Sequence, residues 1–364
     1  MILTLAILFG AGAAVYFLYV TLMILGILRR EARVPGTERS SVAVIVAARN
    51  EADNLPHLLE DLSRQDYSGP IEFVVANDRS RDHTAAIINR WAKRDDRFKA
   101  VHISEASTEL TGKKNALTRA IKATQAEILL ETDADCRVPS SWVSSMVGQF
   151  DEQTGVVVGF SSVRGRSAFN IYQAIDFLGI MMTNAGMLHW GKAWSGSGQN
   201  LAFRRRHFTA IGGFRSGPGI SIGDDFYLVQ ELGRIPGVTV RFNAEVEGQV
   251  TTAPVPTLSE FYHQRIRWAS DSKGLHLKDP LFFSFLASAF ITNTLMIPGL
   301  FLVSSEVFLI IIGLKFCLEL AVIMLGLNSL GRIRDLWLFP VWFLLQPLYI
   351  PVVGVAGQLS KIKW

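Results

Sequence analysis

Carboxylates gather at the ends of predicted strands in this sequence. The stretch from Glu127 to Trp142 begins as an apolar strand and then presents Asp133 and Asp135. Two other apolar runs end in the polar segments 49–51 and 77–80. Crowded carboxylates repel unless a cation is present, and hard divalent metals prefer oxygen ligands. We therefore expect Asp133 and Asp135 to hold Mg²⁺ or Mn²⁺ that bridges to a diphosphate. Two solvated turn carboxylates would give the same pattern.

The second strand end contains Asp78, which we expect to bind a nucleoside. The alternative is that this segment only caps the next helix, through Ser80 or Asp82. The nearby residues 112–117, GKKNAL, look like the end of a phosphate loop. That motif is rejected because Ser107 stands where its first glycine must be and Asn115 follows the lysines.

A pair of adjacent carboxylates, Asp224 and Asp225, opens a predicted amphipathic helix. One member of such a pair can have a raised pKa, which suits a general base. Acidic residues that only stabilise the helix dipole are the alternative.

Another amphipathic helix carries Gln264, Arg267 and Trp268. Gln264 and Arg267 are three positions apart and therefore share one face of the helix. A membrane-surface helix with Trp and Arg at the interface would show the same residues.

Strand-like and helix-like segments alternate from residue 40 onward. Apolar runs such as SVAVIVAA are typical of strands covered on both faces, and leucines at helical spacing follow Asn54, a plausible N-cap. This alternation predicts an α/β fold with a mostly parallel, doubly wound sheet, whose ligands bind outside the carboxyl ends of the strands. The predicted strands are residues 41–48, 71–77, 99–104 and 126–132, and the predicted helices are 54–65, 84–94 and 116–124.

The chain is too apolar for an ordinary soluble domain of its size. Of its 364 residues 49% are hydrophobic, and the mean hydropathy is +0.27. Residues 1–28 carry no charge and are followed at once by arginines, which predicts a retained transmembrane anchor with its end in the cytoplasm. We expect a globular domain at residues 40–275 on the cytoplasmic side and membrane segments within 281–360. The apolar runs there are 281–305, 307–327 and 336–360.

Two apolar segments leave alternatives open. The run 336–360 contains Pro340, Pro347 and Pro351, so it is either a kinked span or a re-entrant hairpin. Residues 169–190 are apolar yet contain Asp176, and we expect an interfacial helix there, as at 257–275; a buried core helix is the alternative for the former.

Lys315 and Glu319 stand four apart in an apolar segment. They predict either a structural intramembrane bridge or a path for a polar headgroup.

Several classes of function are excluded by what the sequence lacks. The net charge of +4 is concentrated beside membrane segments, so it does not predict binding to nucleic acid. The two cysteines lie far apart, which excludes a disulfide framework, and the histidines show no zinc-ligand spacing. No G-x-G-x-x-G follows the first strand, where Asn50 and Glu51 stand instead, so a dinucleotide-binding dehydrogenase is not supported.

Four motifs in order resemble those of the family 2 glycosyltransferases. They are an Asp-Asp-Gly-Ser-like segment at 77–80, TDAD at 132–135, the acidic pair at 224–225 and Q-x-x-R-W at 264–268. The resemblance covers roughly residues 40 to 275. It implies an inverting enzyme with a GT-A fold, from a membrane branch that includes ceramide glucosyltransferases and polysaccharide synthases. Asn77 and the Gly-Asp-Asp sequence at 223–225 depart mildly from the family pattern.

The resemblance also implies roles for individual positions. Asp225, with Asp224 beside it, would be the catalytic base, and Asp135, helped by Asp133, the metal ligand. The donor-binding residues would be Asn50, Glu51, Asp78, Lys113, Asp133, Gln264, Arg267 and Trp268. The segment 195–214 is similar to the family's acceptor-side strand and loop, and would place Gly198, Gln199 and Asn200 near the acceptor, unless it is only a flexible turn.

We therefore expect an integral membrane, metal-dependent glycosyltransferase that moves a sugar from a nucleotide sugar, expected to be a UDP-sugar, to a lipid. The few apolar segments favour a lipid acceptor reached from the bilayer over a polymer channel. A processive polysaccharide synthase and a binding protein without turnover are the alternatives. The sequence names neither the sugar nor the acceptor.

Overall fold

The structure is a computed structural model that describes residues 1–29, 40–105, 107, 110, 112–214, 224–270, 272 and 279–360. It divides into two compact units. The sheet unit comprises Glu31–Arg164 and Gly191–Ala253, together with the terminal Trp364. The helical unit comprises Met1–Arg30, Gly165–Trp190 and Pro254–Lys363.

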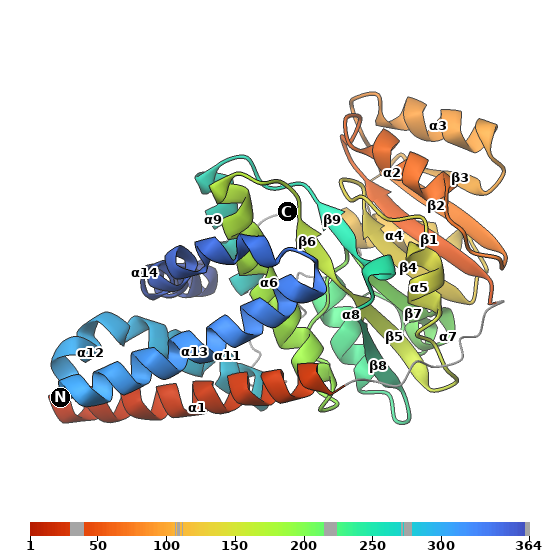
Figure 1. The fold of residues 1–364 in the computed structure, drawn as a ribbon. Helices are drawn as coiled ribbons and strands as arrows, with labels where there is room; N and C mark the ends of the chain where they lie inside the picture. Colours follow the sequence, from red (N-terminus) through yellow and green to blue (C-terminus); the bar gives the residue numbers. More distant parts are fainter. Residues whose placement is uncertain are drawn as a thin grey trace. The chain divides into compact units, whose positions relative to one another are not determined.

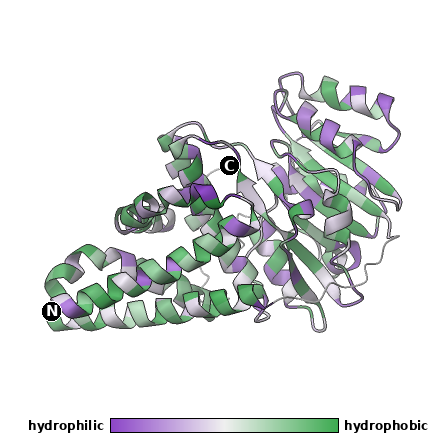
Figure 2. Cartoon of the chain, in the orientation of Figure 1, coloured by the Kyte–Doolittle hydropathy of each residue, from purple (hydrophilic) through white to green (hydrophobic). Residues whose placement is uncertain are grey.

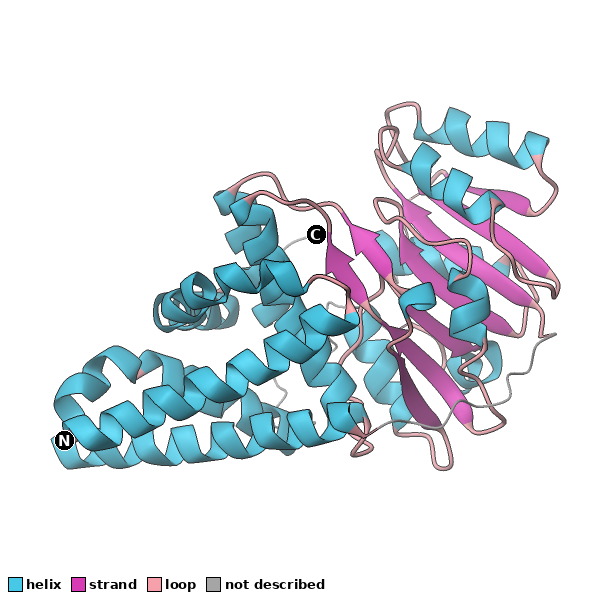
Figure 3. Cartoon of the chain, in the orientation of Figure 1, coloured by secondary structure: helices cyan, strands magenta, loops and turns pink. Residues whose placement is uncertain are grey.

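The sheet unit contains a seven-stranded sheet in the order β3-β2-β1-β4-β7-β5-β8. Neighbouring strands run parallel except β7, which is antiparallel to both β4 and β5. The prediction of a mostly parallel α/β sheet is confirmed (Figures 1 and 3). Its strands are β1 (Val42–Ala48), β2 (Ile71–Asp78), β3 (Phe98–Ile103), β4 (Ile128–Asp133), β5 (Thr154–Gly159), β7 (Leu201–Arg204) and β8 (Thr239–Asn243).

Helices and short strands complete the sheet unit. A parallel pair, β6 (Ser161–Val163) and β9 (Val250–Thr252), forms a separate two-stranded sheet. The helices are α2 (Leu55–Ser63), α3 (Thr84–Arg94), α4 (Gly112–Lys122), α5 (Trp142–Val147), α7 (Arg205–Ala210) and α8 (Asp224–Gly233), with the 3₁₀ turn η1 (Val246–Gly248). The three helices predicted between the first strands are confirmed.

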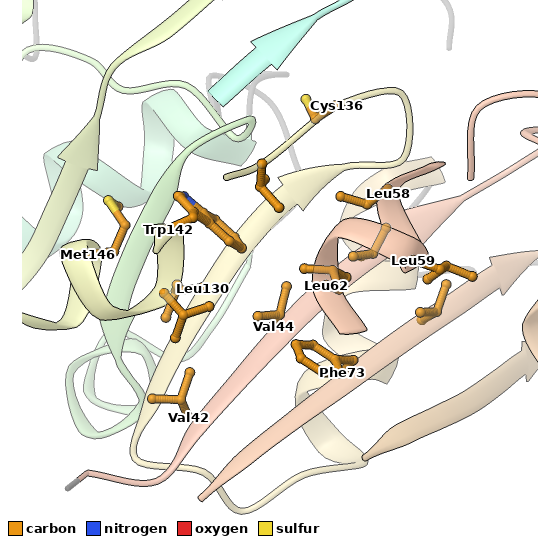
Figure 4. Close-up of a cluster of buried hydrophobic side chains, with 14 of the residues drawn as sticks. Val42, Val44, Leu58, Leu59, Leu62, Phe73, Leu130, Cys136, Trp142 and Met146 are labelled. Carbon is orange, nitrogen blue, oxygen red and sulfur yellow. The ribbon is translucent and has the colours of Figure 1, made fainter. Parts of the chain in front are cut away.

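Strand β1 is apolar throughout and is buried on both faces of the sheet. Val42 and Val44 of β1 pack in one core with the leucines of α2 and with Trp142 and Met146 of α5 (Figure 4). The residue between them, Ala43, faces the opposite side and is equally buried. A strand buried on both faces is typically a continuous apolar run, and this pattern predicts β1 from the sequence.

The strand register brings the polar strand ends to one edge. Ala48 of β1 pairs with Asn77 of β2, and Ala47 pairs with Asp133 of β4. Since these three strands are parallel and adjacent, the residues that follow them leave the sheet side by side. This is the edge at which doubly wound sheets bind ligands.

The helical unit contains the apolar segments. Among its described residues, three helical stretches are long and apolar enough to cross a membrane: Ile2–Leu28, Ser305–Ser329 and Ile333–Leu359 (Figure 2). A further pair bends by 62° at Leu295, as a broken span or a re-entrant loop. The elements are α1 (Ile2–Leu28), α6 (Ala168–Leu188), α9 (Leu258–Ser270), α11 (Pro280–Thr294), α12 (Met296–Leu302), α13 (Ser305–Ser329), η2 (Ile333–Leu338) and α14 (Phe339–Leu359).

The last apolar run forms one helix instead of a hairpin. Helix α14 continues from Phe339 to Leu359 with Pro347 and Pro351 inside it. This outcome favours the kinked span over the re-entrant alternative. Helices α6 and α9 belong to the helical unit, and their interfacial location remains a prediction.

Helices α1 and α6 approach until their backbones touch. A Cβ built on Gly26 would lie 2.1 Å from the carbonyl oxygen of Gly186, and one on Gly186 would lie 2.6 Å from that of Met23. Only glycine permits this separation at both positions. The indole N–H of Trp190 donates to the Leu22 carbonyl and ties the end of the crossing (2.9 Å).

A buried polar network joins three apolar helices. Lys315 Nζ lies 2.7 Å from Glu319 Oε1, so the bridge predicted from their spacing is present. Gln346 of α14 accepts from Lys315 and donates to Glu319, both at 3.0 Å, and the Tyr16 hydroxyl of α1 donates to Glu319 at 2.7 Å. Because all four side chains are buried and bonded to one another, the structural bridge is favoured over a headgroup path.

Replacing Lys315 by methionine should destabilise the protein by roughly 3–5 kcal/mol, because Glu319 then stays buried without its cation. Thermal unfolding in lipid nanodiscs measures the effect. The double variant Lys315→Met/Glu319→Gln should recover much of the loss. Exposed Arg334 supplies the control, Arg334→Met, with little expected change. Equal losses in the single and double variants would contradict a charge-based role.

Candidate active site

The loops that follow β1 and β2 are tied together at the sheet edge. Asn50 Oδ1 accepts from the Arg81 backbone N–H at 2.8 Å, and the Asn50 N–H donates to Ser80 Oγ at 3.0 Å. Asn50 and Arg79 both adopt positive φ, 57° and 56°. Such strained conformations in non-glycine residues persist where the surroundings impose them and are frequent at functional sites. Asn50 therefore shapes the loop on which the predicted donor contact depends.

Glu51 is the carboxylate at the end of β1. Its backbone N–H donates to Thr84 Oγ1 at 2.8 Å, and its Oε2 accepts from Asn54 Nδ2 at 3.0 Å. Burial raises the pKa of Glu51, and the charges of Asp135 and Asp133 raise it further, against the hydrogen bond from Asn54. Asn54 stands at the predicted N-cap position of α2, but its side chain bonds Glu51 and accepts no hydrogen bond from the helix.

Asp78 closes β2 and is almost fully buried, with 4% of its surface exposed. Its Oδ1 accepts from Arg79 Nε at 2.8 Å. Asn77, before it, accepts from the Ser80 N–H and contacts His102, each at 3.2 Å. The capping alternative also holds in part, because Asp82 Oδ1 accepts from the Thr84 N–H at 3.0 Å.

Asp135 lies in a cluster of negative charge at the end of β4. Burial raises its pKa, and the charge of Asp133 raises it further, while Thr252 Oγ1 donates to its carboxylate at 3.1 Å. A bound cation would relieve this repulsion, so the residues fit a divalent metal. In the described part of the chain no three His, Cys, Asp or Glu side chains are grouped closely enough to hold a metal. Such a cation would therefore need further ligands, which a diphosphate can supply.

Lys113 lies between two carboxylates of β4. Its Nζ is 2.7 Å from Asp133 Oδ1 and 2.9 Å from Glu131 Oε1. Glu131 is fully buried and was not singled out from the sequence. The available signal was a lone acidic residue within the apolar run ILLET, two positions before Asp133 and hence on the same face of the strand.

Asp225 is connected to this cluster through Gly198. Its Oδ2 accepts from the Gly198 N–H at 2.9 Å, and its Oδ1 from the Phe226 N–H at 2.8 Å. A Cβ on Gly198 would lie 2.7 Å from Lys113 Nζ and 2.8 Å from Glu131 Oε1, so a larger residue there would displace these two side chains. The structure thus brings Asp225, Gly198, Lys113 and Asp133 together. Asp224 opens α8, and its side chain lies outside the described part.

The residues after Gly198 have different surroundings. The Asn200 side chain is fully buried, accepts from Trp142 Nε1 at 2.9 Å and donates to the Phe160 and Gly248 carbonyls at 2.8 Å each. Since these bonds occupy its amide, the structure gives Asn200 a structural role in place of the predicted acceptor contact. Gln199 is half-buried in the loop.

Gln264, Arg267 and Trp268 lie on α9 of the helical unit, whereas the carboxylates belong to the sheet unit. Gln264 Oε1 accepts from Arg265 at 2.6 Å, and the Trp268 ring packs 5.5 Å from that of Phe177. Their donor-binding roles stay predictions.

Comparison with known proteins identifies the family. The model of glycosyl transferase family 2 matches residues 43–212, and that of glycosyl transferase family group 2 matches residues 132–352, more than half of the chain. The protein belongs to the family 2 glycosyltransferases.

Three individual relatives support this family assignment. A β-monoglucosyldiacylglycerol synthase of Nostoc sp. is 27% identical over 89% of this chain and 71% of its own length. The corresponding protein of Synechocystis sp. is 27% identical over 71% of this chain and 56% of its own length. An N-acetylglucosaminyltransferase of Rhizobium meliloti is 26% identical over 63% of this chain and 55% of its own length.

A solved structure establishes the fold. A mannosyltransferase from Pyrobaculum calidifontis, in complex with GDP-Man and Mn²⁺, superimposes with a TM-score of 0.63 at 21% identity, and the match covers 100% of both chains. The predicted GT-A fold, with one apolar helix before it and three candidate apolar segments after it, is confirmed. The apolar helices fit association with a membrane.

The raised pKa of Asp135 predicts that the contribution of this residue to the free energy of unfolding falls as pH rises. The folded protein favours protonated Asp135 more than the unfolded chain does, so stability is lost as pH rises through the pKa of the folded state. In metal-free protein, Asp135→Asn should raise the melting temperature near pH ~7 and have little effect below pH ~4.

Asp95→Asn provides the control of opposite sign. Hydrogen bonds from Arg97 lower the pKa of Asp95, so this variant should lose stability near pH ~7. Unfolding curves at several pH values compare both variants. A loss of stability in Asp135→Asn at neutral pH would show that the carboxylates do not repel.

Proposed function

We propose that the protein is an inverting glycosyltransferase that moves a sugar from a nucleoside diphosphate sugar, expected to be a UDP-sugar, to a membrane lipid. The observation that carries the proposal is the connection from Asp225 through Gly198 to Lys113 and Asp133, which sets a candidate base beside a candidate diphosphate site. Membership of the family and the names of the Nostoc and Synechocystis relatives support it. We expect an integral membrane protein whose catalytic domain, residues 40–275, lies in the cytoplasm.

Asp225 is the proposed general base. It takes the proton from an acceptor hydroxyl while that oxygen attacks the anomeric carbon from the face opposite the diphosphate. The bond to the diphosphate breaks as the glycosidic bond forms, so configuration inverts. The Gly198 N–H fixes the carboxylate for this step. Asp224 is proposed to support Asp225.

Donor-binding roles are proposed for residues at the sheet edge and for residues of α9. A divalent cation, Mg²⁺ or Mn²⁺, held by Asp135 and Asp133, would neutralise charge on the departing diphosphate. Lys113 adds positive charge beside Asp133. Asp78 is proposed to bind the base, with Asn50 and Glu51 shaping its loop. Gln264, Arg267 and Trp268 are proposed to bind the diphosphate and line the acceptor path, with Gly198 and Gln199 near the acceptor.

Asp225→Asn should lower transfer about 10²–10⁴-fold, because the base is lost, while binding of the nucleotide stays nearly unchanged. Radiolabel transfer and calorimetric titration with UDP and GDP measure the two quantities. Exposed Asp96 supplies the matched control, Asp96→Asn, which should leave both intact. Loss of binding in parallel with transfer would argue against a base.

The acceptor class is tested with purified protein in nanodiscs, Mg²⁺ or Mn²⁺, radiolabelled UDP- and GDP-sugars and a total lipid extract. Label in one discrete lipid band is the expected result and identifies the donor. A high-molecular-weight ladder would indicate a processive polysaccharide synthase instead. Nucleotide binding without any transfer would indicate a binding protein.

A further inference from the structure

Arg265 stands inside the Q-x-x-R-W segment but is not one of its defining residues. It is buried, with 4% of its surface exposed. Its Nε lies 2.5 Å from Oδ2 of Asp176, which projects from the apolar helix α6. A buried arginine and aspartate persist only as a well-bonded pair, because each charge alone would be costly to bury.

Other groups close around this pair. Asp176 also accepts from Trp342 Nε1 at 3.3 Å and from the Tyr349 hydroxyl at 3.4 Å, both of α14. The guanidinium lies over two aromatic rings of its own helix, those of Phe261 and Trp268, at 4.5 and 4.1 Å. The guanidinium plane is therefore fixed on α9 by stacking and across helices by the carboxylate.

A second nitrogen of the Arg265 guanidinium reaches a neighbouring side chain. Arg265 NH1 donates to Gln264 Oε1 at 2.6 Å. Arginine has donors only, so it must face the oxygen of the amide and not its nitrogen. The Nε2 end of Gln264 is then turned away from Arg265. The fixed guanidinium thus decides which end of the Gln264 amide is presented outward as a donor.

We propose that Arg265, held by Asp176, is a positioning residue that orients the Gln264 amide toward the diphosphate of the donor. This inference rests on the proposed function, in which Gln264 binds the diphosphate. Arg265 itself does not touch the substrate. It acts by keeping the N–H donors of Gln264 directed at phosphate oxygens, so that the Gln264 amide loses no rotational freedom when the donor binds.

Arg265→Lys is the sharpest variant, because lysine keeps the charge beside Asp176 but lacks the planar fork that also reaches Gln264. The affinities for UDP and GDP, each with Mn²⁺, are measured by titration calorimetry for wild type, Gln264→Ala, Arg265→Lys and the double variant. Each single change should weaken binding ~10-fold, as expected for a lost hydrogen bond to a charged group. The double variant should bind no more than ~2-fold worse than Gln264→Ala, since both changes remove one interaction.

Two additions keep the result decisive. Asp176→Asn, which retains an acceptor for Trp342 and Tyr349, should give a smaller loss that also disappears in the Gln264→Ala background, and it replaces Arg265→Lys if that variant does not fold. Arg332→Lys is the matched control, because Arg332 also pairs with a carboxylate in the helical unit, that of Asp335 at 2.6 Å. It should leave nucleotide affinity unchanged.

The outcomes separate this inference from the proposed function. Independent losses that multiply to ~100-fold in the double variant would overturn the inference, as would wild-type affinity in Arg265→Lys or no binding of either nucleotide by wild type. Transfer is assayed separately with the labelled donors. Absence of transfer by wild type would overturn the proposed function, while the binding cycle would still decide whether Arg265 acts through Gln264.

Discussion

Repulsion between carboxylates at one sheet edge is the constraint on which the site depends. Glu51 and Asp135 have raised pKa values from burial and from neighbouring negative charge. Like charges brought together repel, so the edge is built at a cost in stability. Lys113, between Glu131 and Asp133, offsets part of this repulsion. The proposed cation, with its phosphate ligands, would relieve the repulsion that remains.

Buried charge is handled differently in the helical unit. Lys315 with Glu319, and Arg265 with Asp176, are closed pairs whose remaining bonding groups are met by Gln346, Tyr16, Trp342 and Tyr349. These networks join helices and leave their charges compensated. The sheet unit keeps an excess of negative charge where a ligand is expected, and the helical unit cancels charge where lipid is expected.

The fold was predictable because its signals are local. Valine-rich runs such as Val42–Ala48 are buried on both faces, and any strand of that kind carries the same pattern. The clustering of the strand-end carboxylates was predictable as well, because adjacent parallel strands end at the same edge of the sheet. Side-chain partners were not predictable in the same way. The Asn54 side chain bonds Glu51, three residues earlier, instead of a backbone N–H of its helix. The Asn200 amide is occupied by Trp142 and by the carbonyls of Phe160 and Gly248, and bonds between segments so far apart leave no trace in sequence spacing. Glu131 was missed since its partner, Lys113, comes from another element.

The contact of Gly26 with Gly186 has a consequence for biosynthesis. The helical unit is assembled from three separate stretches of chain, and α1 is translated first. Its Tyr16 meets Glu319 across 303 residues, which take ~15–60 s to synthesise at 5–20 residues per second. Early in that interval, before α6 is synthesised, α1 has none of its later partners, and lipid is what can cover it. A charge-free helix of 27 residues is suited to this interval, because it needs no protein neighbour to remain inserted in lipid.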